Sequence, residues 1–307
     1  MARRLTGASP RRRTAGAEKP YAAPMSEPSK AVLITGCSSG IGRASALQLA
    51  RSGWKVYATA RRPETIAECK DAGCHTLALD VTDEQSMRAA VDRVEEADGA
   101  VGVLINNAGY SQSGAIETVP LEAVRRQFET NVFGLVRLTQ LVLPKMRAQR
   151  WGRIVNVGSM GGRLVFPGGG HYHATKHALE AISDSLRFEV RGFGIDVTLL
   201  EPGLITTEFG EAAAASMTEI ESSADDPYAE FNATVGAVTK GAYDGPMRRL
   251  GAGPERVAKV IERTISRRRP PARITITPSA KMMIATRRLL TDRAWDAAMR
   301  QQFPQPH

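Results

Sequence analysis

The chain has 307 residues, of which 42% are hydrophobic and 24% are charged. That composition is ordinary for a globular protein, and it excludes a largely disordered chain, a collagen-like chain and a coiled coil. Three cysteines, Cys37, Cys69 and Cys74, are too few and too odd in number for a disulfide scaffold. They suit a reducing compartment, so we expect a cytoplasmic protein.

The net charge of +9 lies mainly at the two ends of the chain. Residues 1–24 contribute +5 and residues 267–307 contribute +7, which leaves the middle of the chain slightly acidic. A nucleic-acid site needs basic groups gathered on a folded face, so we predict no nucleic-acid partner. We expect residues 1–28 to form a disordered basic tail, with a transit peptide or a natural start at Met25 as alternatives. No apolar run approaches the roughly 18 residues of a transmembrane segment.

From residue 31 onwards, short apolar runs alternate with segments of helical period. The apolar runs predict strands at 31–35, 55–59, 76–79, 101–106, 153–157, 195–200 and 274–277. The amphipathic segments predict helices at 41–51, 63–73, 83–97, 121–149, 172–191, 254–267 and 279–302. Thr82 is expected to cap the third of these helices.

Strands that alternate with helices in this way form a parallel sheet with helices on both faces. The sequence therefore predicts a single α/β domain of the doubly wound, Rossmann type, with about seven strands, over residues 29–278. Within it, residues 205–252 break the alternation and are expected to form an irregular insertion, either a lid over the substrate or a surface excursion. Residues 279–307 are expected to form a helical C-terminal extension. Its basic, amphipathic character could place it on a membrane surface, but packing on its own domain is favoured.

A glycine-rich turn joins the first predicted strand to the first predicted helix. Glycines let the backbone approach a ligand closely, and a helix N-terminus offers free N–H groups to a pyrophosphate. An ordinary turn is the alternative, but the position between a strand and a helix favours a dinucleotide site. The residues concerned are Thr35, Gly36, Ser38, Ser39, Gly40, Ile41 and Gly42.

The end of the second predicted strand bears on the choice of cofactor. An acidic residue there would bind the ribose hydroxyls of NAD(H). This chain has Arg61 and Arg62 instead, and their guanidinium groups can pair with the 2′-phosphate of NADP(H). We therefore expect NADP(H) to be favoured and NAD(H) to be possible. Two solvated surface arginines are the alternative interpretation.

Tyr172 and Lys176 lie four residues apart and therefore on one face of a predicted helix. That pair alone is common by chance. Ser159 follows the fifth predicted strand, and ligands of parallel sheets bind beyond the carboxyl ends of the strands. These three residues are therefore candidates for the reacting centre. A hydrolase arrangement of Ser159 with His171 or His173 is a weaker alternative.

Taken in order, these motifs resemble the classical short-chain dehydrogenase/reductase family over about residues 30–275. Further elements of the resemblance are Asp80, the run 106–109 (Asn-Asn-Ala-Gly), Asn131 and the pair Pro202 and Gly203. Each motif is modest by itself. Their shared order and compatible separations make the resemblance specific.

The resemblance implies an NAD(P)(H)-dependent oxidoreductase that interconverts a secondary alcohol and a ketone or aldehyde. Tyr172 would be the general acid or base, and Lys176 would hold the nicotinamide ribose. Ser159 would hydrogen-bond the reacting oxygen, and Asn131 would order a water in the proton path. The remaining residues would contact the cofactor: Asp80, Val81, Asn107, Ala108, Gly109, Pro202, Gly203 and Thr206.

The substrate and the assembly are predicted only in outline. The apolar run from Leu164 to Pro167, just before Tyr172, and the apolar and aromatic residues of 205–250 favour a small hydrophobic alcohol or carbonyl substrate. The resemblance suggests a steroid or a retinoid. It also implies a homodimer or homotetramer built from the helices at 121–149 and 172–191. A non-catalytic NADP(H)-binding sensor is the alternative to an enzyme.

No metal is predicted. Cys69, Cys74 and His75 could suggest zinc, but a fourth ligand and the usual ligand spacing are missing.

Overall fold

A computed structural model describes residues 27–219, 226–244 and 249–306 of the protein. Most of the predicted basic tail, residues 1–26, therefore lies outside the described residues. The described chain contains a parallel sheet in the order β3-β2-β1-β4-β5-β6-β7, which confirms the doubly wound prediction. The strands are β1 (Val32–Ile34), β2 (Val56–Ala60), β3 (His75–Ala78), β4 (Val103–Asn106), β5 (Gly152–Val157), β6 (Ile195–Glu201) and β7 (Arg273–Thr275). Among the described residues, no helix is long and apolar enough to cross a bilayer.

Both faces of the sheet are covered, because successive side chains of a strand point to opposite sides. Val32 and Ile34 pack with α1 (Gly40–Arg51) and α9 (Pro254–Ile265), and Leu33 packs on the opposite face. The helices of that second face are α3 (Glu84–Asp98), α5 (Gly134–Ala148) and α6 (Gly170–Val190). The inner strands β1, β2, β4, β5 and β6 are buried on both faces, so their sequences are mainly apolar. The edge strands β3 and β7 are partly exposed.

The start of α3 differs from the prediction. Asp83, rather than Thr82, is the N-cap, and its carboxylate accepts hydrogen bonds from the backbone N–H groups of Gln85 and Ser86. The Thr82 hydroxyl instead donates to the carboxylate of Asp80 at 2.7 Å. Either residue type can cap a helix, so the sequence alone does not decide between neighbours.

The helix predicted at 121–149 is continuous but not regular. It consists of α4 (Leu121–Phe128), a π-helical segment (Glu129–Phe133) and α5. A π segment inserts an extra residue into the helical turn and is frequent at functional sites. Here it contains Asn131, which is buried.

The prediction of an irregular insertion at 205–252 is wrong for much of its length. The insertion contains α7 (Phe209–Ala215) and α8 (Ala229–Asp244), while residues 220–225 and 245–248 lie outside the described residues. Phe231, Val235 and Val238 recur at helical spacing on α8 and pack into an apolar cluster. The many polar residues around them conceal this period in the sequence.

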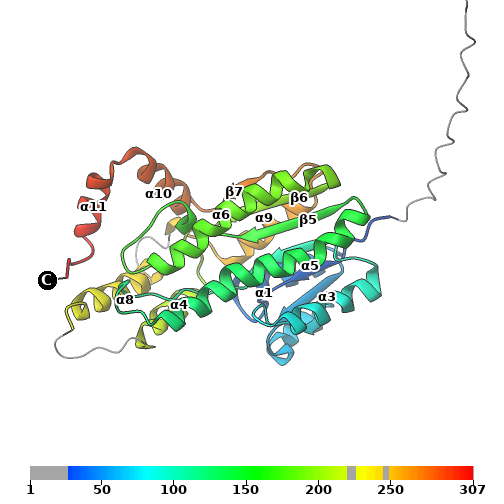
Figure 1. The fold of residues 1–307 in the computed structure, drawn as a ribbon, viewed down its shortest axis with the longest axis horizontal. Coiled ribbons are helices and arrows are strands. Elements are labelled where there is room, and N and C mark those ends of the chain that lie inside the picture. The colour runs from blue at the N-terminus through cyan, green and yellow to red at the C-terminus, as the bar shows by residue number, and fades with distance from the viewer. Residues whose placement is uncertain (1–26, 220–225, 245–248, 307) are drawn as a thin grey trace, which may run out of the picture.

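The C-terminal extension folds as two helices, α10 (Pro278–Leu289) and α11 (Asp292–Arg300). Thr291 caps α11 by accepting a hydrogen bond from the backbone N–H of Ala294. Ile284, Trp295 and Phe303 pack against α8. Figure 1 shows α8, α10 and α11 gathered at one end of the molecule, beyond the sheet. Shorter helical segments are Pro63–Ile66, α2 (Ala67–Asp71), Met160–Gly162, Arg191–Phe193 and Ser216–Glu219.

Candidate active site

A cavity of about 1260 Å³ opens at the carboxyl ends of the strands. Most residues that the sequence nominated for the site line it together, although they come from segments far apart in the chain. They are Gly36, Ser38, Ser39, Gly40, Ile41, Arg61, Asp80, Val81, Asn107, Ala108, Gly109, Ser159, Tyr172, Lys176, Pro202 and Gly203.

Five nominated residues do not line this cavity. Thr35, Gly42 and Asn131 lie behind its wall, where their contacts hold lining residues. Arg62 points elsewhere: its side chain is 77% exposed and lies 4.0 Å from the carboxylate of Glu64. Thr206 is exposed. Its neighbour Thr207 lines the cavity.

The glycine-rich turn has the geometry that a dinucleotide requires. Gly36 and Gly40 have positive φ angles of 70° and 52°, which side chains rarely adopt. A Cβ on Gly42 would overlap the carbonyl oxygen of Gly36, so the first turn of α1 can approach the loop only with glycine there. The N-terminal N–H groups of α1 therefore remain open to a pyrophosphate.

Two side chains fasten the turn to the end of β4. The Thr35 hydroxyl oxygen accepts hydrogen bonds from the backbone N–H groups of Asn107 and Ala108, both at 3.0 Å. The Asn107 amide donates to the carbonyl oxygens of Thr35 and Gly36 at 2.9 and 3.0 Å. These four hydrogen bonds fix the floor of the cavity between β1 and β4.

Lys176 is the buried cation of the site. Its Nζ donates to the carbonyl oxygen of Val157 at 2.9 Å and lies 5.7 Å from the centre of the Tyr172 ring. Burial lowers the pKa of Lys176 to about 8. The backbone at Gly109 runs close to Asn131, since a Cβ there would come within 3.1 Å of the Asn131 side-chain oxygen.

Asn131 connects the π segment to two neighbouring elements. Its amide donates to the carbonyl oxygen of Tyr110 at 2.9 Å and to the hydroxyl of Thr175 at 3.1 Å, and its carbonyl oxygen accepts from the backbone N–H of Tyr110. The side chain thus bridges the loop after β4 and the turn of α6 between Tyr172 and Lys176. A regular helix pattern gives no signal for this bridge.

Ser159 and His173 meet at the short helical segment 160–162. The Ser159 hydroxyl accepts a hydrogen bond from the backbone N–H of Gly161 at 3.0 Å. His173 Nδ1 lies 3.1 Å from the carbonyl oxygen of Gly161, and because a carbonyl can only accept, Nδ1 carries the proton. Burial lowers the pKa of His173 to about 4, so it is neutral at pH 7. The Nδ1 proton of His173 is thus held in a hydrogen bond to the backbone carbonyl oxygen of Gly161.

The far end of the cavity is apolar. Phe209, Val235 and Val238 of the insertion line it, in agreement with the apolar character expected of residues 205–250. Met282, Met283 and Phe303 of the C-terminal extension also line it, and sequence reasoning missed these. Phe166 and Pro167 also line this end, as their apolar character suggested. Trp295 of α11 donates from Nε1 to the carbonyl oxygen of Val165 at 3.3 Å, which fastens the extension to the loop before α6.

At the opposite end, α4 contributes Arg125 and Arg126, which the motifs did not nominate. Asp80 also lies here and accepts hydrogen bonds at Oδ1 from the backbone N–H and the hydroxyl of Thr82. This end is therefore polar and charged, whereas the end near α8 is apolar. A dinucleotide that runs from Arg61 towards Lys176 fits this division.

The fold and the site define a dinucleotide-binding α/β protein. A family model described as short chain dehydrogenase matches residues 30–218. The chain belongs to the short-chain dehydrogenase/reductase family, an oxidoreductase family. This confirms the resemblance stated on motifs alone.

Curated relatives include proteins named for lipid-like substrates. A Bacteroides thetaiotaomicron 3-ketodihydrosphingosine reductase is 35% identical over 255 residues, which are 83% of this chain and 90% of that protein. An NADPH-dependent 3-dehydrocapnine reductase of Ornithobacterium rhinotracheale is 33% identical over 86% of this chain and 94% of that protein. Human 17-beta-hydroxysteroid dehydrogenase type 1 is 39% identical over 62% of this chain and 61% of that protein.

Solved structures agree with the fold. A short-chain dehydrogenase from Streptomyces avermitilis has a TM-score of 0.73 at 34% identity, and covers 90% of this chain and 99% of that chain. A serine dehydrogenase complexed with NADP+ has a TM-score of 0.70 at 27% identity, over 81% and 94%. A family member from Burkholderia phymatum in complex with NAD has a TM-score of 0.70 at 25% identity, over 91% and 98%.

Proposed function

We propose that the protein is an NADP(H)-dependent oxidoreductase that interconverts a secondary alcohol and a ketone on a hydrophobic substrate, with Tyr172 as general acid or base. The observation that carries the proposal is the placement of Ser159, Tyr172 and Lys176 around one cavity whose far end is apolar. The Lys176 ammonium lies 5.7 Å from the centre of the Tyr172 ring.

The proton chemistry follows from these side chains. In reduction, Tyr172 gives its hydroxyl proton to the substrate oxygen while Ser159 donates a hydrogen bond to the same oxygen. The Lys176 ammonium stabilises the tyrosinate that results, and in oxidation each transfer is reversed. When bound, the nicotinamide ring accepts or supplies the hydride. Asn131 orders a water that resupplies the proton, in a position set by Tyr110 and Thr175.

NADP(H) is the cofactor we favour, and Arg61 is the residue on which the preference depends. It lines the cavity after β2, where a guanidinium can pair bidentately with a 2′-phosphate. Arg62 points away, so the role first given to two arginines is proposed for Arg61 alone. Relatives named or solved with NADPH, NADP+ and NAD leave NAD(H) as the second choice.

The substrate class rests on the apolar end of the cavity. We propose that α7 and α8 of the insertion 205–252 and α10 and α11 of the extension 279–307 together close this end of the catalytic domain 29–278. Relatives named for a ketosphingosine and a hydroxysteroid support an extended lipid-like ketone, in place of a choice restricted to steroids and retinoids.

The test is turnover. Purified protein is mixed with NADPH and a panel containing 3-ketodihydrosphingosine, a 17-ketosteroid and a short-chain ketone, and loss of the reduced cofactor's absorbance is followed. Tyr172→Phe should lower kcat by roughly 10²–10⁴-fold. Tyr228→Phe is the matched control, because it removes a hydroxyl that bonds Glu117 away from the cavity. NADPH binding without turnover in the wild type would favour the non-catalytic sensor instead.

We also propose a cytoplasmic homodimer or homotetramer that uses α4, α5 and α6. Phe133 and Phe188 on this helical layer are 54% and 83% exposed, which is unusual for large apolar side chains of a monomer. Light scattering should give a mass above that of the monomer, and Phe188→Arg should shift it towards the monomer. A wild-type monomer at all concentrations would contradict this proposal.

A further inference from the structure

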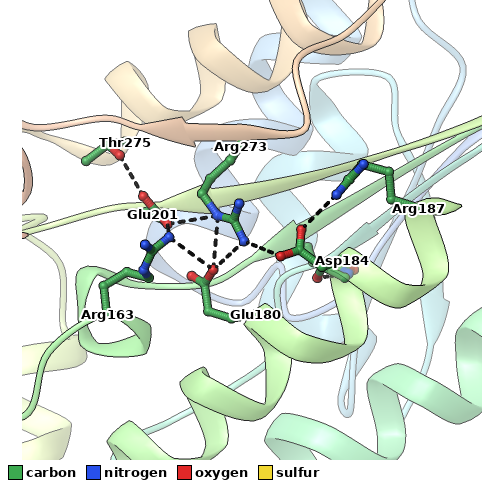
Figure 2. A network of polar contacts seen from close by, with 9 residues as sticks. Arg163, Glu180, Asp184, Arg187, Glu201, Arg273 and Thr275 are labelled. Carbon is green, nitrogen blue, oxygen red and sulfur yellow. Dashed lines mark hydrogen bonds and ion pairs between the residues drawn. The ribbon is translucent and has the colours of Figure 1, made fainter.

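Four charged side chains form a closed ring beside α6, with positive and negative groups in alternation. Arg163 Nη1 lies 3.3 Å from Glu201 Oε1 and 3.7 Å from Glu180 Oε2. Arg273 approaches the same carboxylates, at 2.7 Å from Glu180 and 3.1 Å from Glu201. Figure 2 shows the four side chains pointing towards one another.

The ring is largely withdrawn from solvent. The side chains of Glu201 and Glu180 are 3% and 13% exposed, and Thr275 donates its hydroxyl to Glu201 at 2.6 Å. Removing two carboxylates from water is costly, and apolar residues would often stabilise such a position as well or better. Stability alone is therefore a weak reason for a buried ring of this kind.

Three members of the ring belong to elements that also carry part of the site, and the fourth lies on the neighbouring strand β7. Arg163 ends the segment 160–162 that begins at Ser159, and Glu180 lies one turn beyond Lys176 on α6. Glu201 ends β6 immediately before Pro202, and Arg273 begins β7. Thus the ring joins three parts of the site: the segment 160–162 that follows Ser159 (the serine segment), α6 and the loop after β6.

The junction between the serine segment and α6 is tight. A Cβ on Gly162 would come within 2.8 Å of the carbonyl oxygen of Lys176 and 3.1 Å of the Glu180 side chain. The backbone N–H of Met160 donates to the carbonyl oxygen of Pro202 at 2.8 Å. The backbone that follows Ser159 is therefore packed closely on α6 and bonded to the loop after β6, the same two elements that Arg163 bridges.

We propose that Arg163 is a positioning residue, which holds Ser159 at its working distance from Tyr172 by bridging Glu201 and Glu180. This inference rests on the proposed function. A guanidinium fixes direction as well as distance, because its donors lie in one plane. Displacing a reacting group by about 1 Å can cost on the order of 10²-fold in rate.

The first test compares Arg163→Met with Arg187→Met. Arg187 is the matched control: it pairs with Asp184 at the rim of the same network and does not bridge the ring carboxylates. Arg163→Met should lower kcat by roughly 10–100-fold, with the NADPH Kd and the ketone KM within about threefold of wild type. Arg187→Met should change kcat less than about twofold. Equal losses in the two variants would overturn the inference.

A double-mutant cycle with Ser159→Ala separates positioning from general damage. If Arg163 acts through Ser159, Arg163→Met should have little further effect on kcat once the serine hydroxyl is absent. Multiplicative losses in the double variant would overturn the inference. Arg163→Lys keeps the charge but not the planar fork, and should lose kcat several-fold. Wild-type kcat in this variant would overturn the inference even if Arg163→Met did not fold.

The same experiments distinguish a failure of the proposed function from a failure of the role proposed for Arg163. Absence of ketone turnover in the wild type, or full activity in Ser159→Ala, would overturn the proposed function and this inference with it. Turnover that needs Ser159 but is indifferent to Arg163 would overturn the inference alone.

Discussion

Lys176 Nζ and the carbonyl oxygen of Val157 lie 2.9 Å apart, across the boundary between α6 and the carboxyl end of β5. The position is costly for the fold. Burial lowers the pKa of the ammonium from 10.5 to about 8, so the folded state binds this proton more weakly than the unfolded state. Below pH 8 the charged lysine therefore reduces stability, and this cost disappears as the pH rises from 8 to 10.5.

We expect Lys176→Met to abolish turnover and yet to stabilise the protein at pH 7. The gain should be roughly 1–3 kcal/mol in the free energy of unfolding, because an apolar side chain replaces a desolvated charge. Urea unfolding at pH 7 measures it, with Lys145→Met, at an exposed position, as the control. A variant less stable than wild type would show that the ammonium is better stabilised than its surroundings indicate.

The neutral His173 predicts sensitivity to acid. Its pKa is about 4 in the fold and 6.5 when unfolded, so its contribution to stability is complete above pH 6.5 and is lost as the pH falls through 4. The loss should approach roughly 3 kcal/mol. His173→Asn, which keeps a donor for Gly161, should remove it.

The His173 measurement has to be a difference between variant and wild type, because Glu180 acts in the opposite sense. Burial raises the pKa of Glu180 to about 7, so its contribution is complete below 4.5 and is lost as the pH rises towards 7. Urea midpoints at pH 7 and pH 4.5 provide the comparison. Parallel losses in wild type and His173→Asn would contradict the assignment.

Arg61 and Arg62 provide an internal comparison for cofactor preference. Arg61→Asp should move the ratio of affinities from NADPH towards NADH by on the order of 10–100-fold, since a charge-assisted contact is worth roughly 1.5–3 kcal/mol. Arg62→Asp should move it much less, because Arg62 points away from the cavity towards Glu64. Binding of both cofactors is followed by fluorescence titration. Equal shifts in the two variants would assign the phosphate contact to neither residue in particular.

Gly42→Ala tests the close approach of α1 to the glycine-rich turn. The added methyl group would overlap the Gly36 carbonyl oxygen. We therefore expect the free energy of unfolding to fall by about 1–3 kcal/mol, and NADPH binding to weaken. Gly192→Ala is the control, because a Cβ there meets nothing within 4 Å. Thermal unfolding with and without NADPH separates the two effects. An unchanged stability for Gly42→Ala would mean that the turn relaxes without cost.

The sheet could be predicted from the sequence because burial on both faces makes its inner strands mainly apolar. Residues that line the cavity could be predicted as well, because Ser159, Asn107 and Gly203 come after strands whose carboxyl ends share one edge of the sheet. Local patterns were weaker guides where neighbours compete. Asp83 and Thr82 are both good caps, and in the structure Asp83 caps α3 while the Thr82 hydroxyl bonds Asp80.

Other features depend on contacts between distant segments. Trp295 bonds Val165, and Phe303 reaches the cavity only because α11 folds back over α8. No local pattern near residue 300 indicates this. The ring of Arg163, Glu180, Glu201 and Arg273 is likewise invisible in sequence, where its members look like ordinary surface charges.

The π segment inside the helix of residues 121–148 has a consequence for register. Buried positions recur every four residues, at Ala123, Gln127, Asn131 and Leu135. In a regular α-helix each four-residue step overshoots a full turn by about 40°, so three steps would rotate the face by about 120°. The wider π turn absorbs this overshoot and keeps all four side chains on one side.

The π segment thus adjusts the rotational register between α4 and α5, which share one axis. Deleting Thr130 would restore a regular α-helix, and only one of two sets of contacts could then be kept. Either Asn131 would turn away from Tyr110 and Thr175, or the apolar side of α5 would turn away from the sheet. One additional residue thus lets a single helical rod pack on the sheet and also hold Asn131 against Tyr110 and Thr175.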